Sequence, residues 1–412
     1  MVAREVLPNG LIVLVDERPG ADTLAFQLNA CAGSRDDGPA PGITALTSRL
    51  MFQGTRRRPS EADLQRAAAA VGGSVSRGTG NELSDFLALL PADEAGLGFD
   101  LLADLVVEPL LADDAFARQV QIATQELSRQ RSDPGSLLGD LYQSHVFAGH
   151  PLAAPLLGTA ESLAALSPEA LGDHRRRFWG ASNLVLAVAG RISAAEAAGR
   201  ARDAFGALPA GAPNVRPAQT PAGPAGGTVG ESAGQQQAQF RLGFLAPDLG
   251  SDDRFAFRVL NALTAGASGR LFESVRNARG QAYSATSSYS AYSDAGTWFA
   301  SAGVDPQNLE PALDAVWAEV QRLAAAPPDA AEVALRVGQL AGQQILSGES
   351  NTARASRLIA QEVLGVEPQE ELVRRLRQVG PEDVWRVARA YLLPGRSLLA
   401  TIRPPEAPGG SP

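Results

Sequence analysis

Hydrophobic and polar residues follow two different periods along this chain, one typical of strands and one typical of helices. Alternation of period two predicts strands at Leu11–Asp16, Thr23–Leu28 and Ala238–Phe244. Apolar residues at helical spacing predict helices over 64–71, 94–107, 114–131, 253–263, 308–325 and 330–346. Because strands come in pairs and helices cluster, the pattern predicts an α+β fold with mainly antiparallel sheets and helices packed on one face.

A Pro-, Ala- and Gly-rich segment at 208–230 interrupts this pattern and predicts a linker. The parts on either side of it end alike. Pro168–Phe178 has the pattern of a helix and is followed by a turn and a strand at 184–189, and Pro381–Tyr391 is followed by a turn and a strand at 397–402. The repeat predicts two homologous domains, at 1–207 and 231–412.

Composition and charge exclude several classes of protein. The 412 residues are 45% hydrophobic and 20% charged, as in globular proteins, and the net charge of −9 argues against a nucleic-acid partner. No apolar stretch approaches the roughly 20 residues of a membrane span, and the first ten residues lack the apolar core of a signal peptide. We therefore expect a soluble cytoplasmic protein without a membrane partner. The single Cys31 excludes an intramolecular disulfide and a thiolate metal cluster.

Residues 41–55 carry the first recognisable motif, with the sequence Pro-Gly-Ile-Thr-Ala-Leu-Thr-Ser-Arg-Leu-Met-Phe-Gln-Gly-Thr. The motif resembles the zinc-binding helix of the pitrilysin and insulin-degrading-enzyme family, whose inverted motif is His-x-x-Glu-His. The resemblance places Ala45 at the first zinc ligand, Ser48 at the general base and Arg49 at the second ligand. A methyl group cannot coordinate zinc and a guanidinium repels it, so we expect no metal at this degenerate site.

The family's third zinc ligand is a Glu on a later helix, and the resemblance places it at Glu126. One carboxylate does not make a metal site, so we expect Glu126 to be solvated or paired with Arg49. The three histidines, His145, His150 and His174, offer no i, i+4 pair for zinc. His150 lies in a Gly-His-Pro-Leu segment similar to a structural segment of the family, and packing or surface roles are expected for all three.

The second half carries a motif that resembles the family's Ser-Arg-Leu-Phe…Arg…Gly-Leu-Ala-Tyr signature. It runs from Ser268-Gly269-Arg270-Leu271-Phe272 to Gly280-Gln281-Ala282-Tyr283. In active members the Arg and Tyr of this signature hold the substrate backbone and the developing oxyanion, and they fall here on Arg276 and Tyr283. A guanidinium and a phenol are suitable donors to negative charge as it forms. The alternative is an Arg–aromatic stack or a surface pair.

A segment at 74–79 corresponds to the edge strand that pairs with the substrate backbone in active members. Ser76 and Arg77 stand where those members have Asn and Ala. Peptide pairing on this half is therefore in doubt, and a structural role or a contact between chains is the alternative.

The resemblance covers most of the chain and implies a function for it. Chains of this length in the family hold two homologous domains and pair into a clam-shell around a peptide chamber. We expect a non-catalytic subunit of a zinc peptidase, inactive alone and without a cofactor of its own, which lends Arg276 and Tyr283 to the zinc site of a homologous partner that carries His-x-x-Glu-His. The alternative is a structural or assembly protein with the same fold, and the isolated chain could form a homodimer.

Overall fold

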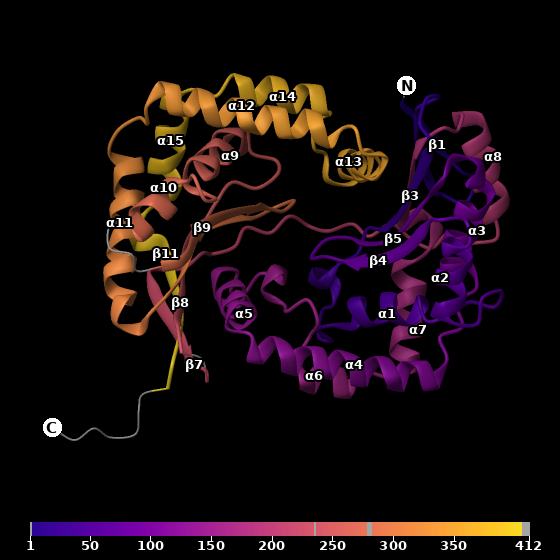
Figure 1. Cartoon of the computed structure of the whole chain (residues 1–412). Helices are drawn as coiled ribbons and strands as arrows, with labels where there is room; N and C mark the ends of the chain where they lie inside the picture. The colour runs from indigo at the N-terminus through magenta and orange to yellow at the C-terminus, as the bar shows by residue number, and fades with distance from the viewer. Residues whose placement is uncertain (1, 235, 278–281, 406–412) are drawn as a thin grey trace. The chain divides into compact units, whose positions relative to one another are not determined.

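The computed structural model describes residues 2–234, 236–277 and 282–405 (Figure 1). The chain forms two compact units, and neither unit is one continuous stretch of sequence. Unit 1 comprises Met1–Leu127, Ala154–Pro217 and Ser347–Val366, and unit 2 comprises Ser128–Ala153, Ala218–Leu346 and Glu367–Pro412. Each unit therefore includes one segment from the other half of the sequence.

Unit 1 contains a six-stranded sheet of order β1-β2-β6-β3-β5-β4, in which only the β2–β6 pair is parallel. Its strands are β1 (Val2–Val6), β2 (Ile12–Glu17), β3 (Thr23–Ala30), β4 (Ser74–Thr79), β5 (Ser84–Pro91) and β6 (Leu184–Gly190). The order places β4 at one edge of the sheet, where one side of its backbone is not paired with another strand.

Both faces of this sheet are covered. Leu24 and Phe26 of β3 pack into a core that includes Phe99 of helix α3 (Ala95–Val107). Ala25 points to the other face, where it packs with Leu358 of helix α13 (Asn351–Leu364). The double cover explains why β6 is buried along its whole length and reads as a nearly continuous apolar run.

The other helices of unit 1 are α1 (Ile43–Met51), α2 (Glu61–Ala69), α4 (Asp113–Ser132, whose last residues belong to unit 2), α6 (Ala160–Ala165), α7 (Pro168–Phe178) and α8 (Ala194–Phe205). The side chains of Ser60 and Ser167 cap α2 and α7 by accepting hydrogen bonds from backbone N–H groups in the first turn. The predicted helix at Pro168–Phe178 is confirmed with both of its ends.

Unit 2 contains a five-stranded sheet of order β7-β11-β8-β10-β9, in which only β7–β11 is parallel. Its strands are β7 (Gly227–Ser232), β8 (Ala238–Leu245), β9 (Ala282–Ala291), β10 (Gly296–Val304) and β11 (Ser397–Arg403). Its helices are α5 (Pro134–Val146), α9 (Asp253–Thr264), α10 (Arg270–Phe272), α11 (Leu309–Ala325), α12 (Ala330–Ser347, whose last residue belongs to unit 1), α14 (Gln369–Arg377) and α15 (Pro381–Tyr391), with a π-helical turn, η5, at Glu273–Asn277.

The second sheet is also covered on both faces. Phe240 and Trp298 pack into a core with α9, α11 and α15, whereas Leu398 and Ile402 pack on the opposite face with Leu138 of α5. Another α5 residue, Tyr142, lies so close to β8 that a Cβ on Gly243 would stand 1.9 Å from its hydroxyl oxygen. Glycine is therefore required there for close packing of helix and strand.

The two sheets repeat one topology. In each, the last strand runs parallel to an early strand and antiparallel to the next, so β2, β6, β3, β5 and β4 correspond to β7, β11, β8, β10 and β9. Helix α7 precedes β6 as α15 precedes β11. The α+β class and the mainly antiparallel sheets predicted from the sequence are confirmed. The helices are not confined to one face, because α13 and α5 each cover a second one.

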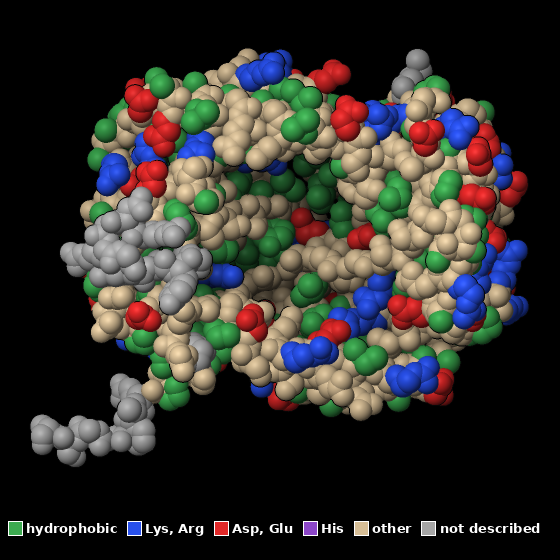
Figure 2. Space-filling model, in the orientation of Figure 1, with side chains coloured by type: hydrophobic (Ala, Val, Ile, Leu, Met, Phe, Trp, Pro, Cys, Tyr) green, Lys and Arg blue, Asp and Glu red, His purple; other side chains and the backbone are tan. Residues whose placement is uncertain are grey.

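The Pro-, Ala- and Gly-rich segment forms no helix or strand from 209 to 226, and β7 begins within the range predicted as a linker. Its first part is anchored on unit 1, where Asn214 and Arg216 bond to Asp36 (2.9 and 2.6 Å). Among the described residues, no helix is long and apolar enough to cross a membrane. The face drawn in Figure 2 intersperses acidic and arginine side chains.

Candidate functional site

The motif helix α1 begins at Gly42, which has a left-handed backbone (φ 91°). A Cβ at this position would stand 2.6 Å from the carbonyl oxygen of Leu157, so glycine is needed for both conformation and space. Leu157 belongs to the segment Pro155-Leu156-Leu157-Gly158-Thr159, which follows the Gly-His-Pro-Leu segment in the sequence. That segment therefore supports the first turn of the motif helix.

The carboxylate of Asp37 fixes the start of α1. It accepts hydrogen bonds from the backbone N–H groups of Gly42 (2.6 Å) and Thr44 (3.1 Å) and from the Thr44 hydroxyl (2.5 Å). Burial raises the pKa of Asp37 to about 6, against the lowering effect of these hydrogen bonds. Asp37 thus takes the role of a helix cap from outside the N-cap position.

His174 of α7 supports the same turn, with its Nε2 2.9 Å from the Thr44 hydroxyl oxygen. Burial lowers the pKa of His174 to about 4, so the imidazole is neutral at pH 7. Since the Thr44 hydroxyl donates to Asp37, Nε2–H of His174 is assigned as the donor to Thr44.

The other two histidines have packing and surface positions. His150 Nδ1 accepts a hydrogen bond from Leu152 N (3.2 Å), and its Nε2 lies 3.6 Å from Asp294 Oδ1 within unit 2. His145 is exposed on α5.

The three degenerate motif positions lie together on the buried part of α1. The exposed fractions of Ala45, Ser48 and Arg49 are 4%, 0% and 8%. Ser48 Oγ accepts a hydrogen bond from the hydroxyl of Thr79 on β4 (3.2 Å), and Arg49 Nη2 donates to Glu126 Oε2 of α4 (2.5 Å). The expected pairing of Arg49 with Glu126 is therefore present.

These residues do not fit a zinc ion. Ala45 offers no ligand atom, and the guanidinium of Arg49 already holds the carboxylate that the family uses as third ligand. Elsewhere in the described part of the chain, no group of three or more His, Cys, Asp or Glu side chains is placed to hold a metal ion.

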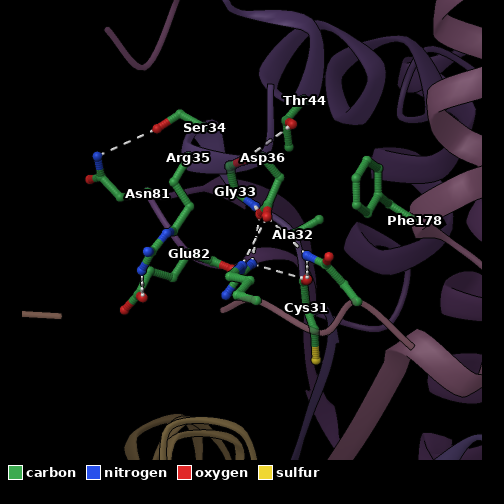
Figure 3. A network of polar contacts seen from close by, with 12 residues as sticks. Cys31, Ala32, Gly33, Ser34, Arg35, Asp36, Thr44, Asn81, Glu82 and Phe178 are labelled. Atoms are coloured by element: carbon green, nitrogen blue, oxygen red, sulfur yellow. Dashed lines mark hydrogen bonds and ion pairs between the residues drawn. The ribbon is translucent and has the colours of Figure 1, made fainter. Parts of the chain in front are cut away.

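A polar network holds the loop that leads from β3 into α1 (Figure 3). Arg216 donates to the carboxylate of Asp36 and to the backbone carbonyls of Cys31 and Glu82 (3.0 and 2.6 Å). Asp36 also accepts from Gly33 N (2.8 Å), and Arg35 forms a buried ion pair with Glu82 (2.6 Å). Burial raises the pKa of the Cys31 thiol to about 11, which opposes the reactive thiolate form.

Sequence reasoning missed the contribution of Asn214 and Arg216, because their surroundings have the composition of a linker. One signal was available: Arg216 is the single charged residue between 209 and 230. A charged side chain within an otherwise uncharged Pro-, Ala- and Gly-rich segment indicates a specific partner.

The second motif lies on α10, η5 and β9 of unit 2. Arg270 forms ion pairs with Glu332 (2.5 Å) and with the buried Glu319 (3.2 Å), so it ties α10 to α11 and α12. Burial raises the pKa of Glu319. Arg276 is in η5 and Tyr283 is near the start of β9, but both side chains lie outside the described part of the structure.

A cavity of about 290 Å³ lies in unit 2. Pro221 and Pro224 of the Pro-rich segment line it together with Asp248, Tyr391 and Arg396. Among the described residues, none from either family signature contributes to its lining.

Comparison with known proteins relates both the fold and the sequence motifs to one family. A family model described as Insulinase (Peptidase family M16) matches residues 12–160, and one described as Peptidase M16 inactive domain matches residues 165–340. An uncharacterized zinc protease of Streptomyces coelicolor is 31% identical over 98% of this chain and 91% of its own length. An uncharacterized zinc protease of Mycobacterium tuberculosis is 29% identical over 97% and 93%.

Solved structures show the same fold at lower identity. A protease from Helicobacter pylori matches with a TM-score of 0.93 and 17% identity, over 98% of this chain and 99% of that chain. A peptidase M16 inactive domain from Pseudomonas fluorescens matches with 0.91 and 22%, over 98% and 99%. A chain of complex III from Candida albicans matches with 0.82 and 21%, over 98% and 96%.

The duplicated sheets, the frame of α1 and the relative at 31% identity lead to the same conclusion, and the chain belongs to the pitrilysin-like M16 peptidase family.

Proposed function

We propose that this chain is a non-catalytic subunit of a heteromeric zinc peptidase and performs no hydrolysis alone. The observation that carries the proposal is the ion pair between Arg49 and Glu126. Arg49 stands at the motif position of the second zinc ligand and binds Glu126, which stands at the position of the third. Ala45, at the position of the first, has no ligand atom. The general-base position holds Ser48, whose oxygen is already bonded to Thr79.

Arg276 and Tyr283 are the residues that we assign to the partner's reaction. When a peptide carbonyl is attacked, negative charge develops on its oxygen, and a guanidinium and a phenolic O–H stabilise that charge more than the neutral ground state. The partner would be a homologous chain with His-x-x-Glu-His, and zinc would be bound there. This chain would also contribute to the wall of the peptide chamber.

The test reconstitutes the purified chain with a His-x-x-Glu-His-bearing homologue from the same genome. We expect neither hydrolysis of a fluorogenic peptide nor stoichiometric zinc with this chain alone, and hydrolysis with the pair. In the pair, Arg276→Ala or Tyr283→Phe should lower kcat by about 10- to 1,000-fold, as loss of one oxyanion donor does. Arg374→Ala is the matched control, because Arg374 is an exposed residue paired with Glu371 on the surface of α14. Full activity in both motif variants would refute the proposal.

A second candidate function is that of a structural or assembly protein. It is favoured by the fold shared with a chain of complex III from Candida albicans, although that similarity concerns fold alone. The same reconstitution separates the two candidates. A stable complex that stays intact in Arg276→Ala and Tyr283→Phe, with no effect of either change on hydrolysis, would favour the structural function.

A further inference from the structure

Two arginines of unit 1 lie beside the degenerate motif, and one of them has an unused donor. Arg49 donates to Glu126 through Nη2, but its Nη1 is buried and makes no hydrogen bond with any described residue. A guanidinium has five N–H donors and cannot lose its charge in a protein. A buried donor without an acceptor costs free energy, so an acceptor from a ligand that reaches Nη1 would be stabilising.

The second arginine is Arg77 on the edge strand β4. It is partly buried and forms no hydrogen bond or ion pair within the described residues. Its side chain lies on the same face of β4 as Val75, which packs in the core, and Thr79, which bonds to Ser48 of α1. The guanidinium of Arg77 therefore lies on the side of the sheet that α1 and Arg49 cover.

Two carboxylates, Glu61 and Glu126, lie near the two guanidiniums, so the formal charges of the four groups balance. Burial lowers the pKa of Arg77, the charge of Arg49 lowers it further, and Glu61 and Glu126 act in the opposite direction. Both carboxylates already have partners, since Glu126 binds Arg49 and Glu61 accepts a hydrogen bond from Gln53 (2.7 Å). Nη1 of Arg49 and the guanidinium of Arg77 are donors that neither carboxylate uses within the described residues, so they are open to the oxygens of an additional anion.

The backbone of β4 offers a second set of contacts beside this pair. Gly80 N, beyond the strand end, donates to Leu83 on the β5 side, whereas Val75 O accepts from Gln65 of α2 (3.0 Å). In an antiparallel edge strand, residues two apart direct their N–H and C=O to the same side. The backbone groups of Arg77, two residues from Val75, therefore face the open edge.

We propose that Arg49 and Arg77 form a carboxylate-binding site, and that its ligand is the C-terminal carboxylate of an extended peptide lying along β4. Guanidinium groups bind planar carboxylates through paired, charge-assisted hydrogen bonds. The open edge at Arg77 offers main-chain partners that a free anion would not use. A fixed cation of the chain itself thus stands at the motif position where relatives would place a metal ligand, and it retains peptide ends without cutting them. The site requires neither a partner chain nor Arg276 and Tyr283.

The experiment measures fluorescence anisotropy of an N-terminally fluorescein-labelled random decapeptide mixture, made once with a free C-terminal carboxylate and once as the C-terminal amide. The wild-type chain should bind the free acid about 10- to 100-fold more tightly than the amide, as expected for charge-assisted hydrogen bonds. Equal affinity for the two forms would overturn the proposal. If phosphate or acetate displaces the labelled peptides while the acid and amide forms bind equally, the site binds small anions and the proposed peptide ligand is wrong.

Variants assign the effect to the two arginines. Arg77→Gln and Arg49→Gln should each reduce the preference for acid over amide at least about fivefold, because each removes one charged donor. Arg66→Gln, at an exposed arginine of α2 paired with Asp63, is the control and should keep the preference. Urea unfolding of each variant checks that it folds. Arg77→Gln should be no less stable than wild type, and an unchanged preference in a folded Arg77→Gln chain would contradict the assignment.

Discussion

Helices α1 and α9 follow equivalent strands of the duplicated sheets, but they bury different kinds of side chain. All nine residues of α1 are buried, and Thr44, Thr47, Ser48 and Arg49 are among them. The buried residues of α9 are mostly apolar, including Phe257 and Leu260, with Arg254 and Thr264 as the polar members. Burying polar side chains costs free energy unless they are hydrogen-bonded, and such departures from an apolar core are typical of functional sites. The polar interior of α1 therefore makes unit 1 the better candidate for a site.

The contrast extends to the way each helix starts. Asp37 reaches the first turn of α1 with three hydrogen bonds, whereas Asp252 at the N-cap of α9 makes no side-chain cap bond. Unit 1 thus holds the start of α1 by hydrogen bonds in the same helix that carries Ala45, Ser48 and Arg49 at the motif positions. We expect that the hydrogen bonds that hold α1 and the identities of its motif residues can be changed independently of one another.

The largest effect is expected from restoring the motif itself. The triple substitution Ala45→His, Ser48→Glu and Arg49→His should convert a chain without stoichiometric zinc into one that binds one zinc ion, because Glu126 remains as third ligand. Metal content after dialysis, measured by mass spectrometry, checks this. Adding Glu126→Gln to the triple variant should reduce zinc binding again. A folded triple variant without zinc would show that the frame has changed together with the ligands.

A smaller effect should distinguish the two helix starts. Asp37→Ala should lower the free energy of unfolding by about 3 kcal/mol, because two buried backbone N–H groups and a hydroxyl lose a charged acceptor. Asp252→Ala, at the N-cap of α9, should cost about 0.5 kcal/mol or less, because its side chain is mostly exposed. Urea unfolding of both variants measures the difference. Equal costs would contradict the special support of α1.

The smallest effect concerns pH. His174 has a pKa of about 4 in the folded chain, below its ordinary value of 6.5, so the unfolded state binds more protons between these values and His174 makes stability rise with pH there. Asp37 acts oppositely, because its pKa of about 6 lies above 3.8 and its contribution falls as pH rises through that window.

The variant His174→Gln isolates one of these opposing contributions. The stability advantage of wild type over His174→Gln should be largest above pH 6.5 and should shrink by about 2 kcal/mol towards pH 4. The imidazole of wild type is neutral while buried and takes up a proton when unfolding exposes it, which favours the unfolded state, whereas glutamine takes up none. Unfolding curves at several pH values measure this, and a constant difference would contradict the assignment of His174.

The sequence predicted the repeated units where local signals were strong. A Pro at the first helical position and a buried strand located α7 with β6 and α15 with β11. Strand β7 was missed because it is largely exposed and contains two Gly and one apolar residue, Val229, so its hydrophobic pattern is weak. Family resemblance located Arg49 and Glu126, but the position of Arg77 relative to Arg49 depends on strand register and side-chain direction, which spacing alone does not give.

The exchange of helices between the two halves of the sequence has a consequence for synthesis. The sheet of unit 1 is complete in sequence by Gly190, but its second face is covered by α13, which ends at Leu364. During translation the apolar side chains on that face remain uncovered until most of the chain has left the ribosome. A gene cut at the Pro-rich segment would therefore yield two fragments that each lack one covering helix, and the two halves depend on one another although they repeat the same fold.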